Sequence, residues 1–506
     1  MKKGIVYIIG AGPGDPGLIT LKGAAFLSRA DVVIYDHLAS GELLRHARSG
    51  ARLIYAGKKG GDHTLSQDEL NGLIACEAER GNVVARLKGG DPFIFGRGGE
   101  EAEILARLGI PFEVVPGVTS AISAPAYAGI PLTHREYTST VAFVTGHEDP
   151  SKEKSDIDWR ALACIGTLVF LMGVKNLSRI AGNLIASGKD PGTPAALIRW
   201  GTTSDQETVT GTLENIARRA DEKGVSPPAV LVVGGVVDLR STLDWFEKKP
   251  LFGKGIVITR TEEQSGDFAE LLREKGARPI LFPTIRIAPV ESRRGLDRAL
   301  AEIEKYHWIV FTSANGVRAF FSRLMEKEMD ARSLKGIGIC AIGPATASLI
   351  RSYGIRADIV PEEYISEGIV AAFRKRDLHD KRVLLPRAEK ARDVLPEELA
   401  KLGAQVDVVA VYRTVGSGRR KSELDGLIRR GEVDVITFTS PSTVIEFMNI
   451  MGDSFRLPGS VRVACIGPVT AAQALKSGLR IDIMQEQYTI PAMVEALEEY
   501  YRKPRS

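Results

Sequence analysis

The stretch that decides the fold of the N-terminal half is Val6–Leu21, which reads VYIIGAGPGDPGLITL. An apolar run leads into a glycine-rich turn, and the pattern predicts a helix that starts directly after the turn. This order of strand, turn and helix is typical of α/β proteins. Because many nucleotide phosphates are bound at a glycine turn before a helix, the stretch also raises the question of a nucleotide site.

The turn departs from the GxGxxG fingerprint of dinucleotide-binding proteins. Asp15 stands where the third glycine belongs, and Pro13 and Pro16 have no N–H group to offer a pyrophosphate. A carboxylate at a helix start also repels an anion, so we interpret Asp15 as the N-cap and Pro16 as the first helical residue. The strand Asp31–Asp36, DVVIYD, ends in an acid about where a ribose-binding carboxylate lies. An NAD-binding oxidoreductase therefore remains an alternative.

A second glycine cluster lies in Val83–Leu105, which reads VVARLKGGDPFIFGRGGEEAEIL. A buried strand runs into Gly89, Gly90 and Asp91, where the backbone is bare and a carboxylate stands alone. Open amides and a lone carboxylate suit the amino-acid end and the hydroxyl groups of an adenosylated amino acid. A tight turn capped by Asp91 explains the same residues equally well.

The composition is that of a globular protein with several domains: 506 residues, 44% hydrophobic, 26% charged and a net charge of +4. No apolar run reaches the length of a membrane span, and no basic stripe with interleaved aromatic residues is present. We expect a cytoplasmic protein without membrane or nucleic-acid partners. The four cysteines never form CxxC and the seven histidines never form HxxxH or HExxH, so we expect no metal.

The segment Trp245–Gly255, WFEKKPLFGKG, is the predicted seam between two domains, because it combines a proline, two glycines and several lysines after an apolar strand. A new strand–helix–strand unit follows as GIVITR, SGDFAELLREKGA and RPILFPTIRI. The helix carries Phe268, Leu271 and Leu272 on one face, and Gly276 lies where a C-cap belongs. A second α/β domain is therefore predicted to begin near residue 253.

The second half contains a divergent internal repeat. WIVFTSANGV (308–317) matches VITFTSPSTV (435–444), and CAIGPATASL (340–349) matches CIGPVTAAQAL (465–475). Each copy reads as a strand, a turn and a helix, and the copies are far enough apart to belong to two similar lobes. Two lobes imply a cleft, which is a usual place for a ligand.

The N-terminal half closely resembles uroporphyrinogen-III C-methyltransferases of the tetrapyrrole methylase family over about residues 3–245. The resemblance is carried by VYIIGAGPGDPGLITLKG, ADVVIYDHLAS, GKKGGDHTLSQDELN, VVARLKGGDPFIFGRGGEE, VPGVTSAISAPAYAGIPLTHRE and FVTGH. It implies two α/β subdomains with a cleft and S-adenosylmethionine (SAM) as methyl donor, leaving S-adenosylhomocysteine. The implied reaction is methylation of uroporphyrinogen III at C2 and C7 to precorrin-2, without a metal. The family also suggests a homodimer through this half.

The resemblance further implies site residues. Those implied for SAM are Pro13, Gly89, Gly90, Asp91, Ile94, Thr119, Ser120, Met172 and Gly201. Asp36 is implied as the proton acceptor, a role in which the alignment of the carboxylate matters as much as its basicity. Lys58 is implied as the proton donor. The alternative for Lys58 is a solvated lysine or one that binds a carboxylate. We add Arg97, His134 and Arg135 as candidates for binding the carboxylates of the substrate. The chain departs from the family pattern at Leu171 and at Arg199-Trp200, which affects details of the adenine pocket.

Residues 253–500 resemble uroporphyrinogen-III synthases. The matching pieces are IVFTSANGV, AIGPATASL, VLLPRAEKARDVLPEELAKLGAQVDVVAVYRT, TFTSPSTV and CIGPVTAAQA. The resemblance implies a two-lobed α/β fold that closes hydroxymethylbilane to uroporphyrinogen III, with inversion of ring D, loss of water and no cofactor. The expected domains are 1–246 for the methyltransferase, 247–253 for a linker and 254–506 for the synthase. Lobe one then comprises about 254–287 and 415–500, and lobe two about 288–414.

In the synthase half, Tyr412 matches the tyrosine usually proposed to assist loss of the hydroxyl group, as an acid or as a positioning group. Thr346 and Ser440 match residues thought to touch the substrate, although the FTS and GPxT turns are explained by helix capping as well. A non-catalytic two-lobed binding module remains the alternative for this half. The two implied reactions are consecutive, because the product of the synthase is the substrate of the methyltransferase.

Overall fold

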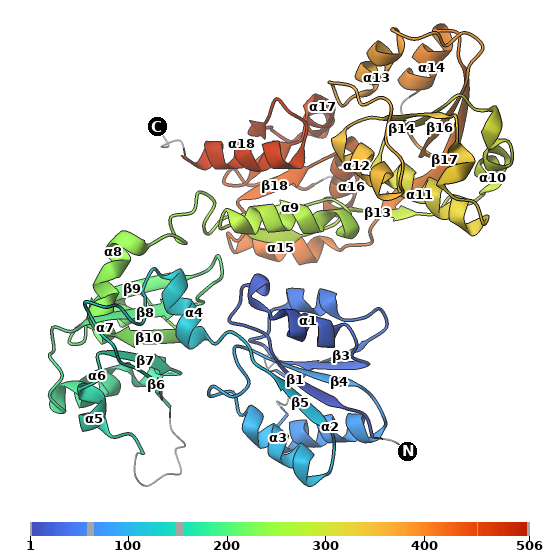
Figure 1. The fold of residues 1–506 in the computed structure, drawn as a ribbon. Helices are drawn as coiled ribbons and strands as arrows, with labels where there is room; N and C mark the ends of the chain where they lie inside the picture. The colour runs from blue at the N-terminus through green and yellow to red at the C-terminus, as the bar shows by residue number, and fades with distance from the viewer. Residues whose placement is uncertain (1–2, 58–64, 148–155, 392, 453, 503–506) are drawn as a thin grey trace. The chain divides into compact units, whose positions relative to one another are not determined.

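The structure is a computed structural model that describes residues 3–57, 65–147, 156–391, 393–452 and 454–502. The chain divides into two compact units, Met1–Gly253 with Lys275–Arg278 and Lys254–Glu274 with Pro279–Ser506 (Figure 1). Helices and strands alternate in both, which confirms the predicted α/β class. The short 3-10 helices are η1 (Pro16–Leu18), η2 (Gly41–His46), η3 (Val174–Asn176), η4 (Gly235–Leu239), η5 (Ile303–Lys305) and η6 (Ala331–Leu334). Within the described residues, no helix is both long enough and apolar enough to cross a membrane.

The first sheet of the N-terminal unit is parallel, with strand order β3-β2-β4-β1-β5. Its elements are β1 (Val6–Gly10), α1 (Leu21–Leu27), β2 (Val32–Tyr35), β3 (Arg52–Tyr55), α2 (Gln67–Glu79), β4 (Val84–Lys88), α3 (Gly98–Arg107) and β5 (Phe112–Val115). Ile8 packs in a core with α2 and α3, whereas its neighbour Ile9 packs in a core with α1. Both faces of the sheet are therefore covered, as is usual for parallel sheets.

The carboxyl ends of β1, β2 and β4 meet at one edge of this sheet. The turn with Pro13 follows β1, Asp36 follows β2, and Gly89 follows β4. Open α/β sheets bind their ligands outside this edge. The fold thus brings together motifs that are far apart in the sequence.

The second sheet of the N-terminal unit is mixed, with strand order β6-β7-β10-β8-β9. Its elements are α4 (Ser120–Tyr127), β6 (Val141–Thr145), α5 (Trp159–Ala163), β7 (Thr167–Leu171), α6 (Leu177–Ala186), β8 (Pro194–Arg199), β9 (Glu207–Thr212), α7 (Ile216–Glu222), β10 (Ala229–Val233) and α8 (Arg240–Leu243). Ala121 and Ala124 of α4 pack against Val169 and Ile198 of this sheet. Because α4 begins directly after Thr119, Thr119 lies where the chain passes from the first sheet to the second.

One sheet of the C-terminal unit has the strand order β12-β11-β18-β19-β20. Its elements are β11 (Gly255–Ile258), α9 (Glu262–Glu274), β12 (Arg278–Leu281), α15 (Lys421–Arg429), β18 (Val435–Phe438), α16 (Pro441–Met451), β19 (Arg462–Cys465), α17 (Pro468–Lys476), β20 (Ile483–Met484) and α18 (Ile490–Arg502). Phe438 and Phe447 are fully buried in its core. The sheet therefore combines strands from the start and the end of this half.

The other sheet of this unit has the strand order β13-β17-β16-β14-β15. Its elements are β13 (Ile285–Ala288), α10 (Arg294–Ala301), β14 (Trp308–Phe311), α11 (Ala314–Glu326), β15 (Gly338–Ala341), α12 (Pro344–Ser352), α13 (Ser366–Phe373), β16 (Arg382–Ala388), α14 (Val394–Lys401) and β17 (Gln405–Gly416). The chain enters on β13 and leaves on β17, which pair antiparallel from Ile285 opposite Gly416. The two lobes are thus joined by two adjacent strands.

The predicted single strand RPILFPTIRI is in fact two strands, β12 and β13, which belong to different sheets. Pro283 lies between them and has no N–H group for a strand ladder, so a continuous central strand is disfavoured there. Thr284 then ties the crossing to the first lobe, because its Oγ1 donates to the carbonyl oxygen of Thr259 at 3.1 Å.

The internal repeat is a structural repeat. Phe311 ends β14 and Phe438 ends β18, and both are fully buried. Ser313 caps α11 through the N–H of Gly316 at 3.0 Å, and Ser440 caps α16 in the same way. Each sheet of the C-terminal unit therefore carries one copy of the strand, the FTS turn and the helix, as the repeat predicts.

Candidate active sites

The N-terminal unit contains a cavity of about 760 Å³ between its two sheets. One wall is made by the loops after β1, β2 and β4, and the other by residues around β7, β8 and β10. This size is typical of sites for small molecules and cofactors. The residues implied for SAM line this cavity without exception: Pro13, Gly89, Gly90, Asp91, Ile94, Thr119, Ser120, Met172 and Gly201.

Close backbone contacts explain the glycines beside this cavity. Gly12 and Gly90 pair through two backbone hydrogen bonds, 3.2 Å and 2.7 Å long. A Cβ atom on Gly117 would lie 2.3 Å from the carbonyl oxygen of Gly90, and one on Gly10 would lie 2.4 Å from the Cα of Gly117. Any side chain at these positions would therefore force the loops apart.

Asp15 is the N-cap of η1, as predicted. Its Oδ1 accepts a hydrogen bond from the N–H of Gly17 at 2.8 Å, and Pro16 is the first residue of the helix. The hydroxyl group of Tyr127 donates to Asp15 Oδ2 at 2.7 Å. Burial and this acidic partner raise the pKa of Tyr127. The carboxylate thus belongs to a local hydrogen-bond network, and a phosphate would meet a negative charge here.

Asp91 caps its own turn. Oδ1 accepts from the N–H groups of Phe93 at 2.8 Å and Ile94 at 3.1 Å, and Oδ2 accepts from the N–H of Gly117 at 2.9 Å. Capping therefore uses both oxygens, while Asp91 also lines the cavity. The capping explanation is confirmed, and the contact of Asp91 with a ligand stays a prediction.

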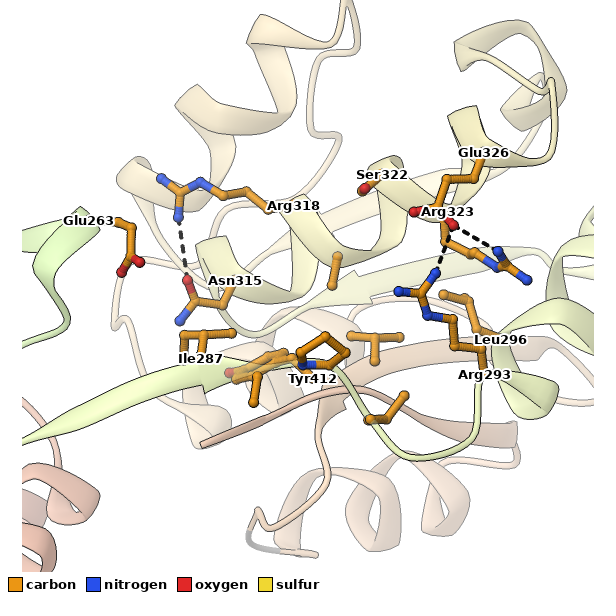
Figure 2. Close-up of a pocket in the computed structure, with 15 residues that line it drawn as sticks. Glu263, Ile287, Arg293, Leu296, Asn315, Arg318, Ser322, Arg323, Glu326 and Tyr412 are labelled. Carbon is orange, nitrogen blue, oxygen red and sulfur yellow. Dashed lines mark hydrogen bonds and ion pairs between the residues drawn. The ribbon is translucent and has the colours of Figure 1, made fainter. Parts of the chain in front are cut away.

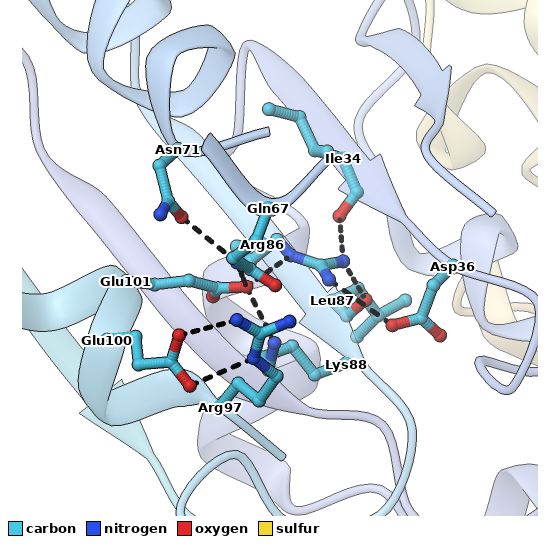
Figure 3. Close-up of polar contacts among 10 residues, drawn as sticks. All are labelled: Ile34, Asp36, Gln67, Asn71, Arg86, Leu87, Lys88, Arg97, Glu100 and Glu101. Atoms are coloured by element: carbon cyan, nitrogen blue, oxygen red, sulfur yellow. Dashed lines mark hydrogen bonds and ion pairs between the residues drawn. The ribbon is translucent and has the colours of Figure 1, made fainter. Parts of the chain in front are cut away.

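Asp36 lies at the cavity wall directly after β2, with 28% of its side chain exposed. Oδ1 accepts from the N–H groups of Leu38 and Ala39 at 3.1 Å and 3.2 Å, and Oδ2 accepts from Arg86 Nη2 at 3.3 Å (Figure 3). The carboxylate is thus held from two sides with one edge toward the cavity. Lys58, its predicted partner, lies outside the described residues.

The candidates for binding substrate carboxylates fall in different places. Arg97 lines the cavity and forms a fork with Glu100, with N–O distances of 2.9 Å and 2.7 Å (Figure 3). This pairing raises the pKa of Arg97 and lowers that of Glu100. His134 and Arg135 lie in the loop after α4, and neither is among the described residues that line the cavity. The structure thus brings only Arg97 of the three to Asp36 and the glycine loops.

Backbone strain marks the same cavity. Phe95, Arg97, Met172 and Trp200 line it and have φ angles between +46° and +58°, a region that residues other than glycine rarely adopt. Strained backbone of this kind gathers at functional sites. Sequence patterns carry no signal for positive φ angles at such residues. Leu171 and Trp200, where the chain departs from the family pattern, both line the cavity.

The C-terminal unit has a cavity of about 330 Å³ beside α11 (Figure 2). It is lined by Glu263, Ile287, Ala288, Pro289, Val290, Arg293, Leu296, Asn315, Arg318, Ala319, Ser322, Arg323, Glu326, Val411 and Tyr412. Arg293 and Arg323 both bind Glu326, and Arg318 donates to Asn315 at 3.3 Å. The cavity therefore has an apolar floor and a rim with arginines.

Tyr412 lies in this cavity with 9% of the residue exposed. Its hydroxyl group is 3.1 Å from Ser313 Oγ of the first FTS turn. Burial raises the pKa of Tyr412, and the bond to Ser313 opposes this. Thr346 is buried in α12 and Ser440 caps α16, and neither lines the cavity. Ser313 was not singled out in the sequence, although as the repeat partner of Ser440 it could have been.

No group of three or more His, Cys, Asp or Glu side chains in the described ranges is arranged to hold a metal ion.

The chain matches two family models. Tetrapyrrole (Corrin/Porphyrin) Methylases matches residues 5–217, and Uroporphyrinogen-III synthase HemD matches residues 266–495. Over 500 residues the chain is 39% identical to the porphyrin biosynthesis protein HemD of Ruminiclostridium josui, which covers 99% of this chain and 98% of that protein. The chain belongs to this family of fused methylase and synthase proteins.

Three further similarities cover about half of the chain each. An S-adenosyl-L-methionine-dependent uroporphyrinogen III methyltransferase of Methanosarcina barkeri is 54% identical over 241 residues, 47% of this chain and 94% of that protein. Two solved structures from Thermus thermophilus also align. One is a uroporphyrin-III C-methyltransferase complexed with S-adenosyl homocysteine, with 41% identity and a TM-score of 0.41 over 47% of this chain and 100% of that chain. The other is a mutant uroporphyrinogen III synthase, with 21% identity and a TM-score of 0.38 over 50% of this chain and 100% of that chain. Family membership decides the class of each half: a methylase region comes first in the chain and a synthase region follows.

Proposed function

We propose that the C-terminal half converts hydroxymethylbilane to uroporphyrinogen III and that the N-terminal half methylates this product at C2 and C7 to precorrin-2. The observation that carries the proposal is the full-length similarity to a porphyrin biosynthesis protein, together with the cavity described in each half. The expected domain bounds, the cytoplasmic location and the homodimer through the N-terminal half belong to the same proposal. So does the expectation that no metal takes part.

The residues around the N-terminal cavity fit SAM. The turns at Gly12 and Gly90 have little side-chain bulk, and apolar residues of the second sheet, including Leu171 and Ile198, suit an adenine ring. Nothing at this site demands a phosphate, since Asp15 and Pro13 both oppose one. When bound, SAM supplies an electrophilic methyl group on a positively charged sulfur atom. The protein then has to bind the tetrapyrrole and align its ring carbon.

Asp36 is the proposed proton acceptor. Methylation of a pyrrole carbon must be followed by loss of a proton, and Asp36 presents a fixed carboxylate to the cavity. Arg97 is the proposed anchor for a substrate carboxylate, since a guanidinium group binds carboxylates through paired donors. Lys58 stays the proposed proton donor. His134 and Arg135 stay proposed substrate contacts, although neither is among the described residues that line the cavity.

In the synthase half, Tyr412 is the proposed acid for the departing hydroxyl group. Burial raises its pKa, so the phenol keeps its proton at neutral pH and can donate it or a hydrogen bond. Its bond to Ser313 fits the alternative that Tyr412 positions the substrate. Thr346 and Ser440 remain proposed contacts of the substrate.

Each activity is tested with the other half as its control. In the full chain, Asp36→Asn should reduce methyl transfer to uroporphyrinogen III and leave conversion of hydroxymethylbilane unchanged. Tyr412→Phe should do the reverse. Loss of both activities in either variant, or of neither in both, would contradict the assignment of the two reactions to the two halves.

A further inference from the structure

A buried group of charged side chains lies at the carboxyl end of β4, next to Asp36 (Figure 3). Arg86 is 3% exposed, Lys88 is 5% exposed and Glu101 is 2% exposed. Charged residues are rarely buried so deeply unless they are paired. Arg86 and Lys88 are two residues apart on one strand, so their side chains leave the same face of the sheet. Glu101 reaches them from α3. The function proposed above uses none of the three.

Glu101 is shared by the two cations. Its Oε1 accepts from Lys88 Nζ at 2.7 Å and from Arg86 Nε at 3.3 Å. Among the described residues its Oε2 is buried and has no hydrogen-bond partner. Glu101 contacts Arg86 at Nε, so Nη1 and Nη2 remain for other acceptors.

Arg86 uses these donors to reach the cavity wall. Nη2 donates to Asp36 Oδ2 at 3.3 Å, and Nη1 donates to the carbonyl oxygen of Leu87 at 3.1 Å. The guanidinium group is planar and its donors have fixed directions, so its attachment to Glu101 and to the strand also fixes the edge that faces Asp36. Asp36 is thereby held on the side opposite its bonds to the backbone of Leu38 and Ala39.

The charges of this cluster balance only when Asp36 is included. Arg86 and Lys88 contribute two positive charges to the interior and Glu101 one negative charge. Burial and the charge of Arg86 lower the pKa of Lys88, while Glu101 and Asp36 oppose this shift. Buried ion pairs add little stability compared with apolar residues of the same size. Their position beside a cavity therefore points to a role in the reaction.

We propose that Arg86 is a positioning residue for methyl transfer: it holds the Asp36 carboxylate oriented toward the cavity. Glu101, which Lys88 also contacts, holds Arg86 from the other side. This inference rests on the proposed role of Asp36 as proton acceptor. It adds a connected path of contacts from α3 through β4 to the reacting carboxylate.

The test measures methyl transfer to uroporphyrinogen III by the full chain. Arg86→Gln should lower kcat roughly 10- to 100-fold, the size of effect expected when a reacting group is misplaced by about 1 Å. The loss should fall on kcat and not on KM, because Arg86 is not among the described residues that line the cavity. Binding of S-adenosylhomocysteine should be unchanged, and Arg86→Lys should restore part of kcat.

The control is Arg80→Gln. Arg80 pairs with another buried glutamate of the same subdomain, with Nη1 at 3.0 Å from Glu77 Oε1, but 62% of its own side chain is exposed and it does not line the cavity. This variant should keep the wild-type kcat. If it lowers kcat as Arg86→Gln does, loss of any ion pair to a buried glutamate of this subdomain has the same effect and the inference is overturned.

A double-mutant cycle separates positioning from an independent role. In an Asp36→Asn background, Arg86→Gln should cost no further activity, and an equally large further loss would overturn the inference. If Arg86→Gln does not fold, Arg86→Lys decides. It keeps the positive charge but not the separate Nε and Nη2 donors to Glu101 and Asp36, so a wild-type kcat in this variant would overturn the inference. Wild-type methyl transfer by Asp36→Asn would instead refute the proposed function itself.

Discussion

The role of Tyr412 is open to a direct test, because the fold supplies a matched control. Tyr412→Phe removes one hydroxyl group and its contact with Ser313, and the ring remains in the same apolar cluster. The loss of one hydrogen bond costs about 1 kcal/mol of stability, which lowers the Tm by about 2–4 °C for a domain of this size. If the hydroxyl group is the acid, turnover of hydroxymethylbilane should fall roughly 10²- to 10⁴-fold. The effect on rate is therefore far larger than any effect that a 1 kcal/mol loss of stability produces at 25 °C.

The control is Tyr306→Phe in the same lobe and the same apolar cluster. The hydroxyl group of Tyr306 donates to Asp407 Oδ2 at 2.7 Å, and Tyr306 does not line the cavity. Both variants should melt a few degrees below the wild type, but only Tyr412→Phe should lose synthase turnover.

The assay follows consumption of hydroxymethylbilane and the ratio of the two cyclic isomers by chromatography. A wild-type rate and isomer ratio in Tyr412→Phe would refute a role as acid. A normal rate with more of the uninverted isomer would favour the positioning role over the acid.

Two further predictions follow from buried contacts. Gly117→Ala should abolish binding of S-adenosylhomocysteine, measured by calorimetry, because the new Cβ atom would lie 2.3 Å from the carbonyl oxygen of Gly90; unchanged affinity would contradict the close packing of the loops. Iodoacetamide should label Cys76 in the folded protein at pH 8, but not Cys340 or Cys465, as measured by peptide mass spectrometry. Burial raises the pKa of both buried thiols to about 12, so their reactive thiolate forms are absent at that pH, and rapid labelling of either would contradict the fold.

Local signals were enough to predict the fold class. The strand and glycine turn of Val6–Leu21, the repeated FTS turns and the apolar strands indicate α/β units, because these features depend on residues close together in the sequence. Asp15 was recognised as a cap for the same reason. The division of RPILFPTIRI was missed, since a proline in an apolar run predicts a break but not the sheet that each part joins.

The candidate site was predictable only in part. The glycine loops were assigned to one site through the family resemblance, and the fold brings them together because parallel strands have their carboxyl ends at one edge. The burial of Arg86, Lys88 and Glu101 could not be predicted, because charged residues on a strand usually indicate an exposed edge. These side chains are enclosed by the packing of α3 over β4. Whether His134 lines the cavity depends on the path of the loop after α4, for which the sequence has no local signal.

The central claim is that one chain performs two consecutive reactions. The most direct test incubates the purified full chain with hydroxymethylbilane, with and without SAM, and follows the products by absorbance and mass. We expect uroporphyrinogen III without SAM, and the same ring carrying two additional methyl groups when SAM is added. Formation of uroporphyrinogen I alone without SAM would contradict the synthase activity, and an unmethylated type III product with SAM would contradict the methyltransferase activity.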